Sequence, residues 1–313
     1  PMSSQLRIVF MGTPDFATES LKRLVENDFN VVGVVTAPDR PAGRGQKIKH
    51  SSVKTYALEQ SLKILQPVKL KGNSFITDLD SLKADLFVVV AFRMLPEIVL
   101  AMPSKGTFNL HASLLPNYRG AAPINWAVIN GEKETGVSTF FIEKNIDTGN
   151  IIFHEKINIA EDDTAGIIHN KLMYIGSELV CKTINAIENN QAPNVPQIDE
   201  TASHAPKIFK ADCKILWSES AIDIHNKIRG LSPYPTAWTS VDKNKTLKLF
   251  KSTHENANHN LEIGKVVISN NKELKVATHD GFVHIHELQL SGKKRMKTAD
   301  FLCGYSFEDI ILQ

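Results

Sequence analysis

The stretch Asp85-Leu86-Phe87-Val88-Val89-Val90 is almost entirely apolar and rich in β-branched residues. A run of this kind, without alternation, is typical of a strand that is buried on both faces of a sheet. Similar apolar runs lie outward from it along the N-terminal third of the chain, and amphipathic helical patterns separate them. The expected strands are residues 6–10, 31–36 and 63–66, and the expected helices are residues 16–26, 51–60 and 75–83. This alternation predicts an α/β fold with a doubly wound, Rossmann-like parallel sheet that carries helices on both faces.

The pattern changes after Asn109. Two strands are expected around the turn Asp147-Thr148-Gly149, and one long helix follows them. The next residues are rich in Asn, Gln and Pro, which is typical of a linker. A further helix and five short strands then predict a small β-barrel like the five-stranded oligonucleotide-binding (OB) fold. We therefore expect a catalytic domain in residues 1–188, a linker in residues 189–208 and an OB-like domain in residues 209–313.

The composition is that of an ordinary globular protein. Of 313 residues, 42% are hydrophobic and 22% are charged, and the formal net charge is only +2. That charge is too small to indicate nucleic-acid binding unless basic residues cluster locally. No apolar run reaches the roughly 18 residues that a membrane helix needs, and the three cysteines (Cys181, Cys213 and Cys303) lack metal-ligand spacing. We expect a cytoplasmic monomer without a membrane contact or a bound metal.

The densest concentration of chemically useful residues begins with Asn109 and His111. They follow an expected strand, and ligands bind at the carboxyl ends of strands in open parallel sheets. Because they are two residues apart, both side chains would point to one face of a strand. From this pattern alone, a pair of hydrogen-bonded structural residues is as good an interpretation as a functional pair.

Asp147 shifts the balance toward function. A carboxylate in the turn between two strands could orient His111 and support its charged form, and Asn109 could donate to a developing oxyanion. These are the groups that acyl transfer to an amine requires. No activated serine or cysteine accompanies them, which favours direct transfer without a covalent enzyme intermediate.

The same stretch resembles the folate-dependent formyltransferase superfamily. The motifs that carry the resemblance are Asn109-x-His111, Ser113-Leu114-Leu115-Pro116, Tyr118-Arg119-Gly120-Ala121-Ala122-Pro123-Ile124, Asp147-Thr148-Gly149, Gly12-Thr13-Pro14-Asp15-Phe16-Ala17 and Ala37-Pro38-Asp39-Arg40-Pro41-Ala42-Gly43-Arg44-Gly45. The similarity extends over nearly the whole chain, and the ordered set of motifs is highly specific although single motifs are not.

The resemblance implies an activity and roles for particular residues. It implies that Asn109, His111 and Asp147 are catalytic and that 10-formyltetrahydrofolate is the formyl donor. The folate would contact two segments, which comprise Phe92, Arg93, Met94 and Leu95, and Ser113, Leu114, Leu115 and Pro116. The sequence departs from the pattern of relatives at Ala112, where glycine is common, and at Phe92-Arg93, where a Tyr-Gly type pair is common. These departures concern the folate contacts and not the three catalytic residue types.

A basic segment suggests the acceptor. Residues 40–54 contain five basic residues and no acidic one, and glycines and a proline make an open, mobile loop the expected structure. A charge run is usually a solvated surface, yet this one follows the second strand and would lie near the same crevice. The resemblance implies that the acceptor is the free amino group of methionyl initiator tRNA, which yields formylmethionyl-tRNA for translation initiation. The candidate tRNA contacts are Arg40, Arg44, Lys47 and Lys49, with Lys293, Lys294 and Arg295 in the C-terminal domain.

Two alternatives remain open from the sequence. A formyltransferase acting on a small amine, such as a nucleotide-linked sugar or a purine precursor, would share the catalytic motif but would not need the basic segment. A non-catalytic RNA-binding protein on the same fold would not need Asn109, His111 and Asp147 intact. His284 and His286 lie on one expected strand face, where exposed strand residues are a better interpretation than a metal site.

Overall fold

The computed structural model describes residues 5–313, and the chain forms two compact units. The first unit contains the chain up to Gly120 together with Gly136–Ile157 and His169–His204. The second contains Ala121–Thr135, Asn158–Ile168 and Ala205–Gln313. The chain therefore passes between the units several times, and residues 189–204 belong to the first unit. The division of the sequence into a catalytic domain (1–188), a linker (189–208) and an OB-like domain (209–313) stays a prediction.

A seven-stranded sheet organises the first unit, in the order β10-β9-β7-β6-β1-β2-β5. Its strands are β1 (Ile8–Gly12), β2 (Val31–Val35), β5 (Ile64–Leu65), β6 (Leu86–Val90), β7 (Thr107–His111), β9 (Glu134–Phe141) and β10 (Ile151–Asn158). The pairs among β1, β2, β5, β6 and β7 are parallel, which confirms the predicted doubly wound core. β9 runs antiparallel to β7, so the sheet is mixed at one edge.

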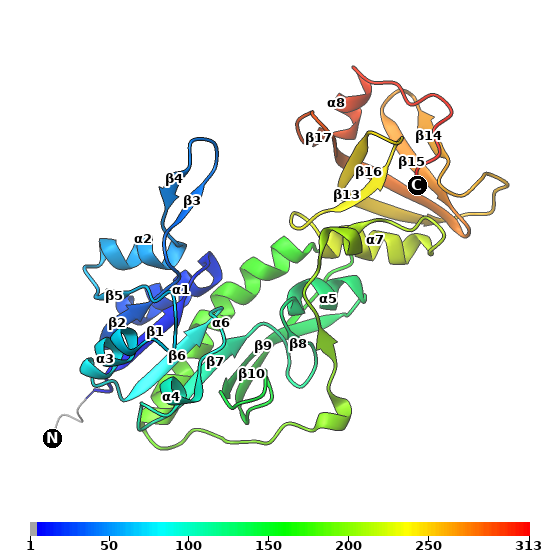
Figure 1. Ribbon diagram of the computed structural model, residues 1–313. Coiled ribbons are helices and arrows are strands. Elements are labelled where there is room, and N and C mark those ends of the chain that lie inside the picture. Colours follow the sequence, from blue (N-terminus) through cyan, green and yellow to red (C-terminus); the bar gives the residue numbers. More distant parts are fainter. Residues whose placement is uncertain (1–4) are drawn as a thin grey trace. The chain divides into compact units, whose positions relative to one another are not determined.

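Helices cover both faces of this sheet (Figure 1). They are α1 (Asp15–Glu26), α2 (Ser52–Glu59), α3 (Asn73–Ser81), α4 (Glu97–Leu100) and α6 (Ala165–Glu188). Side chains of β1 and β6 such as Val9 and Val89 form one apolar cluster with Phe75 of α3 and Val99 of α4. α6 packs close to β7, since a Cβ on Gly176 would come within 2.7 Å of the Leu110 side chain. Burial of apolar side chains on both faces of β1 and β6 explains their unbroken apolar sequences.

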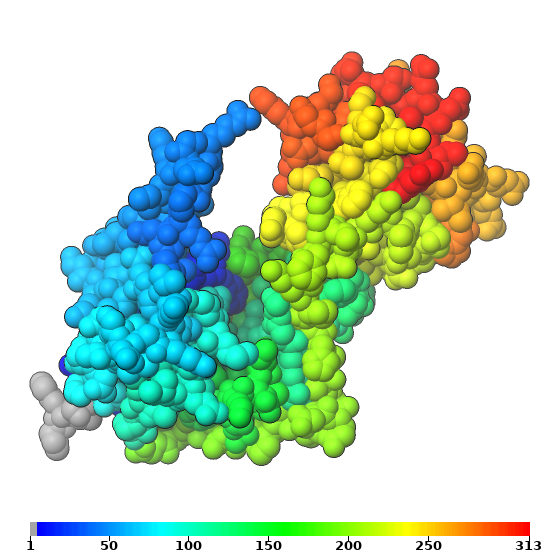
Figure 2. Space-filling model, in the orientation of Figure 1, coloured from blue at the N-terminus to red at the C-terminus, as the bar shows by residue number. Residues whose placement is uncertain are grey.

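The basic segment differs from the expected open loop. It forms a β-hairpin of β3 (Arg40–Ala42) and β4 (Lys47–Lys49), paired in antiparallel register. Gly43 and Gly45 lie in the connecting turn with φ of +74° and +88°, conformations that glycine adopts without steric cost. The hairpin stands out from the surface of its unit (Figure 2). The two glycines therefore build a tight turn.

The second unit is built on an antiparallel sheet in the order β12-β13-β16-β15-β14, with β17 paired to β16. The strands are β12 (Ala237–Ser240), β13 (Thr246–Asn256), β14 (Val266–Ser269), β15 (Glu273–Thr278), β16 (Gly281–Leu290) and β17 (Met296–Lys297). The helices of the same unit are α5 (Pro123–Ile129), α7 (Ala221–Gly230) and α8 (Thr298–Leu302). β8 (Arg119–Gly120), which belongs to the first unit, pairs with β11 (His204–Ala205).

Residues 310–313 connect the two edge strands of this sheet. The N–H groups of Val266 and Ser240 donate to the carbonyl oxygens of Ile310 and Gln313, at 3.0 and 2.7 Å. The last residues therefore bridge β14 and β12 and complete the barrel that the five-strand pattern predicted. Among the described residues, no helix has the length and apolar character needed to cross a membrane. The three cysteines are free.

Candidate active site

Asn109 and His111 lie at the carboxyl end of β7, as the sequence predicted. The pairing of Val90 with Leu110 brings the carboxyl ends of β6 and β7 to one edge of the sheet. Both residues share a strand face with Thr107, whose hydroxyl donates to the Leu100 carbonyl at the end of α4. The opposite face carries Leu110 and is covered by α6. The amide and the imidazole therefore extend from the α4 side of the sheet at its ligand-binding edge.

The two ring nitrogens of His111 have different partners. Nε2 lies 2.8 Å from the backbone carbonyl oxygen of Tyr118. A carbonyl oxygen only accepts, so Nε2 carries a proton in this bond. Nδ1 is left to face Asp147, at 3.7 Å from Oδ2. The imidazole is 7% exposed, so its orientation is held by the protein and the nitrogen available for chemistry is Nδ1.

Asp147 lies in the connection between β9 and β10, with a left-handed φ of +54°. Its Oδ2 accepts a hydrogen bond from the backbone N–H of Gly120 at 2.9 Å. Gly149, two residues on, packs so tightly that an added Cβ would lie 1.6 Å from the Phe141 carbonyl oxygen. The turn Asp147-Thr148-Gly149 is therefore built to place one carboxylate beside His111.

Asn109 completes the group. Its side-chain oxygen Oδ1 is buried and has no hydrogen-bond partner among residues 5–313. Most buried polar groups in proteins are paired, so an unpaired one at a strand end is an unusual feature. Its amide oxygen and nitrogen are interchangeable in assignment. Either assignment leaves an uncommitted amide group next to the imidazole and the carboxylate, which suits binding to a substrate.

The first segment expected to contact folate follows β6. Leu95 is buried in the cluster between α3, α4 and the sheet, Phe92 is partly buried against the same cluster, and Met94 is 65% exposed. The Arg93 guanidinium donates to the backbone carbonyls of Pro67 and Val68, at 2.7 and 3.1 Å, and lies over the Phe92 ring. Arg93 thus ties two loops of the sheet edge together.

Hydrogen bonds from β9 fix the second segment, Ser113 to Pro116. The Ser138 hydroxyl donates to the Ser113 carbonyl and accepts from the Leu115 N–H, at 2.6 and 3.0 Å. The Ser113 hydroxyl donates within the loop to the Asn117 carbonyl, at 2.6 Å, and Leu115 is buried. His154 Nε2 donates to the Leu115 carbonyl at 2.9 Å, and burial lowers the pKa of His154 below its ordinary value. The segment is therefore a rigid shelf beside His111.

The basic residues expected to contact tRNA are exposed. Arg40, Arg44, Lys47 and Lys49 are all exposed on the hairpin. Lys54, at its base, lies 2.7 Å from Asp39, and this hydrogen bond holds the pKa of Asp39 below its ordinary value. In the barrel, Lys293 and Lys294 are exposed.

Arg295 is placed differently from these two lysines. Its Nε donates to Glu287 at 2.6 Å, and its guanidinium packs 4.0 Å from the centre of the Phe250 ring. The side chain thus braces the β16 and β13 surface.

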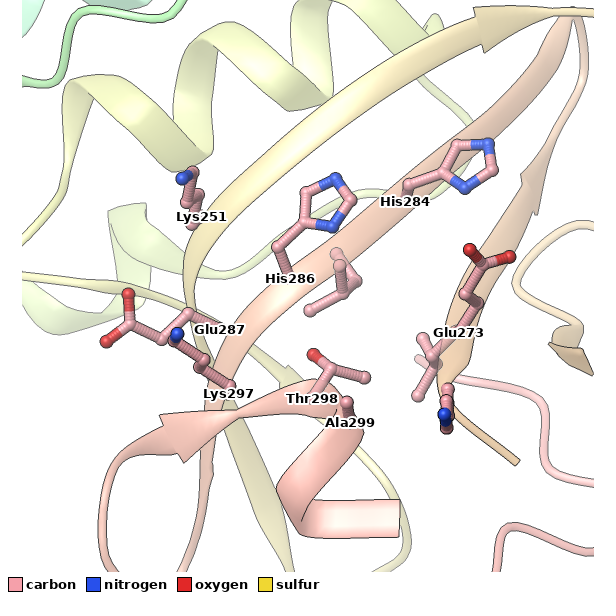
Figure 3. A pocket seen from close by; sticks show the side chains of 11 residues that line it. Lys251, Glu273, His284, His286, Glu287, Lys297, Thr298 and Ala299 are labelled. Atoms are coloured by element: carbon pink, nitrogen blue, oxygen red, sulfur yellow. The ribbon is translucent and has the colours of Figure 1, made fainter. Parts of the chain in front are cut away.

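A separate hollow of about 390 Å³ lies on the barrel (Figure 3). Its charged lining residues, Lys251, Lys272, Lys297, Glu273 and Glu287, nearly balance in charge. It contains none of the three candidate catalytic residues, which lie in the other unit.

The two histidines of the hollow are each bound to β13. His284 Nε2 lies 2.6 Å from Glu255, and His286 Nε2 lies 2.8 Å from the Thr253 hydroxyl. Within residues 5–313, no group of three or more His, Cys, Asp or Glu side chains is arranged to hold a metal ion.

Sequence reasoning missed the backbone groups that hold the site. The Tyr118 carbonyl and the Gly120 N–H contact His111 and Asp147, and a side chain from a distant segment, Gln197, donates to the carbonyls of Asp147 and Gly149 at 2.8 and 2.7 Å. Backbone groups carry no signal in a sequence. Gln197 gave no signal of its own, because it is one of several polar residues in a segment whose composition is typical of a linker.

Two family models cover almost all of the chain. The model described as formyl transferase matches residues 6–184, and the model described as formyl transferase, C-terminal domain, matches residues 207–306. The chain therefore belongs to the formyl transferase family, as the sequence motifs predicted.

Curated relatives make the resemblance more specific. The chain is 52% identical to the methionyl-tRNA formyltransferase of Bacteroides thetaiotaomicron, over 97% of each sequence. It is also 52% identical to that of Flavobacterium johnsoniae, over 97% of this chain and 98% of the relative.

Solved structures share the fold. An N-formyltransferase from Helicobacter canadensis, in complex with folinic acid and dTDP-3-aminofucose, superposes with a TM-score of 0.68 at 24% identity, over 93% of this chain and 100% of that one. HypX from Aquifex aeolicus, in complex with tetrahydrofolic acid, gives 0.66 at 17% identity, over 98% of this chain and 50% of that one.

Proposed function

We propose that this enzyme transfers the formyl group of 10-formyltetrahydrofolate to the free amino group of methionyl initiator tRNA. The observation that carries the proposal is the grouping of Asn109, His111 and Asp147 at one sheet edge, with His111 Nδ1 directed at the carboxylate 3.7 Å away. Identity of about 52% to methionyl-tRNA formyltransferases over nearly the full length supports the choice of acceptor. The product, formylmethionyl-tRNA, serves translation initiation, and we place the enzyme in the cytoplasm as a monomer.

The donor would lie along the two segments that flank the site. Residues 113–116 form the rigid shelf beside His111, and Phe92 to Leu95 line the neighbouring strand end. Phe92 and the exposed Met94 offer apolar surface that suits a flat pteridine ring, and the buried Leu95 anchors the segment to the core. The Helicobacter canadensis enzyme, in complex with folinic acid, and HypX, in complex with tetrahydrofolic acid, share this fold, which agrees with a folate donor.

The transfer needs one bond made and one broken. The amine nitrogen attacks the formyl carbon, and the carbonyl oxygen becomes an oxyanion. The Asn109 amide and the protonated Nδ1 of His111 donate to this oxyanion, and the Asp147 carboxylate stabilises the imidazolium. Collapse of the intermediate breaks the bond from carbon to the folate nitrogen. The proton lost by the amine passes through water and Asp147 to that leaving nitrogen, so charge and atoms balance.

The hairpin supports a polyanionic acceptor. Four exposed cations on β3, β4 and their turn can contact phosphates, while a small amine substrate would leave them unused. Arg44 lies between the two glycines of the turn and is the residue that we place at the acceptor end of the tRNA. In the barrel, Lys293 and Lys294 present exposed ammonium groups to the RNA backbone, with Arg295 beside them on Glu287.

A choice of acceptors tests the proposal. The purified protein is incubated with 10-formyltetrahydrofolate and either charged initiator tRNA or a UDP-linked amino sugar. We expect formylmethionine after hydrolysis of the tRNA and no formylated sugar. Formylation of the sugar alone would contradict tRNA as the acceptor. Formylation of neither substrate would contradict the assignment of Asn109, His111 and Asp147 as catalytic residues.

A further inference from the structure

We infer that Gln197 is a positioning residue that holds the carboxylate of Asp147 in place for catalysis. The inference rests on the proposed function, because it assumes that Asp147 acts in formyl transfer. It concerns a residue that lies about fifty positions away in sequence from Asp147 and that contributes no group to the reacting atoms.

The Gln197 side-chain amide links the Asp147 turn to Arg119, and we refer to this arrangement as the clamp. Its Nε2 donates to the backbone carbonyls on either side of Thr148, namely those of Asp147 and Gly149, at 2.8 and 2.7 Å. Its Oε1 accepts from the Arg119 guanidinium through Nε and Nη2, at 3.1 and 3.0 Å. All four distances are ordinary for strong hydrogen bonds. The amide therefore satisfies both its donor hydrogens and its acceptor at once.

Arg119 makes the other side of the clamp rigid. The residue is 8% exposed, and its Nη2 also donates to Asp199 at 2.9 Å. Its neighbour Gly120 supplies the N–H that binds the Asp147 carboxylate. The Asp147 carboxylate therefore binds Gly120 directly. The backbone of the same turn is linked through Gln197 to Arg119, the residue that precedes Gly120.

The turn needs such support. Glu143 through Ile146 are exposed, so few buried contacts fix the loop before Asp147. Asp147 itself holds a left-handed φ of +54°, a backbone conformation that is unfavourable for a residue other than glycine. The two hydrogen bonds from the Gln197 amide stabilise the turn in this conformation.

The same segment also reaches His111. The Ser203 hydroxyl accepts from the Tyr118 N–H at 2.9 Å, and the Ser203 carbonyl accepts from the Arg119 N–H at 2.9 Å. Tyr118 in turn offers its carbonyl to His111. Residues 195–204 therefore act as a brace beneath the site, although their composition is that of a connecting linker.

The test uses Gln197→Met, which keeps the length of the side chain and removes every hydrogen bond. Gln191→Met is the matched control, because Gln191 is an exposed glutamine in the same stretch. A misplacement of about 1 Å can cost about 100-fold in rate. We expect kcat to fall by about 10- to 100-fold in Gln197→Met, KM for both substrates to change less than about threefold, and the control to behave as wild type.

A double-mutant cycle with Asp147→Asn separates positioning from general stability. If Gln197 acts through the carboxylate, Gln197→Met should add less than about threefold to the loss in Asp147→Asn. A second variant, Gln197→Glu, still accepts from Arg119 but sets an oxygen against two carbonyls, and we expect it to lose turnover as well.

The failures are distinguishable. Wild-type kcat in Gln197→Met together with a large loss in Asp147→Asn overturns the clamp and leaves the proposed function standing. Additive losses in the cycle also overturn it. Wild-type turnover in Asp147→Asn removes the catalytic role of Asp147, and the clamp with it, whereas the absence of formyl transfer to tRNA by the wild-type enzyme overturns the proposed function.

Discussion

Replacing Asp147 with asparagine isolates the charge of the carboxylate. The amide oxygen of the variant still accepts from the Gly120 N–H, so the turn keeps its hydrogen bond and the local fold is preserved. At the observed separation of 3.7 Å from His111 Nδ1, a unit charge pair is worth about 4 kcal/mol at an effective dielectric of ~20 and about 1 kcal/mol in water. Since each 1.36 kcal/mol corresponds to about tenfold in rate, Asp147→Asn should lower kcat by about 5- to 10³-fold.

The assay is single-turnover formation of formylmethionyl-tRNA with the enzyme in excess, so that product release does not limit the rate. Asp78→Asn, an exposed aspartate on α3, serves as the control for loss of one negative charge. The affinity for tRNA should stay within about threefold, because the carboxylate faces His111 and not the basic hairpin. A rate within twofold of wild type would refute the reasoning that the carboxylate stabilises the imidazolium.

Four further outcomes follow from the structure. His111→Ala should reduce turnover by about 10²–10⁴-fold with normal tRNA binding in a filter assay, and a fully active variant would exclude the assignment. Arg44→Ala should weaken use of methionyl-tRNA far more than folate binding and should lower the salt dependence of tRNA affinity by about one unit of slope; equal effects on both substrates would make the hairpin structural. Gly149→Ala should destabilise the protein by about 3 kcal/mol in denaturant unfolding, because its Cβ would meet a backbone carbonyl, whereas Gly304→Ala, with no atom within 4 Å, should not. Burial lowers the pKa of His225, so the unfolded chain binds more protons below pH about 6.5 and stability should fall as the pH drops below that value; His225→Gln should flatten this dependence in urea titrations at pH 5 and 7.5, and an unchanged slope would contradict it.

The sheet was predictable because its core strands are buried on both faces. Leu86–Val90 has no polar residue, and an apolar run of this length is typical of a strand that is buried on both faces. α4 was not predicted, because a helix of four residues has no full period to recognise. The antiparallel direction of β9 was also beyond the sequence, since apolar content does not encode strand direction.

The candidate site divides in the same way. Asn109 and His111 could be predicted as candidates from their type and spacing, and Asp147 from its turn, although only the set of motifs around them favoured formyl transfer as the function. Their supports do not, because the contacts from Tyr118 and Gln197 are a backbone carbonyl and a side chain from a distant segment. The hairpin was mistaken for an open loop because exposed strands with charged side chains lack the apolar alternation that identifies buried ones.

The most direct measurement uses a donor labelled in its formyl group, with a single turnover stopped by acid. Direct transfer by Asn109, His111 and Asp147 predicts that the label passes to the methionyl amine of the tRNA at the rate of donor loss, with no label on the protein at any time. It also predicts that His111→Ala slows this transfer. Label trapped on the protein, or transfer at the wild-type rate in the variant, would contradict the account.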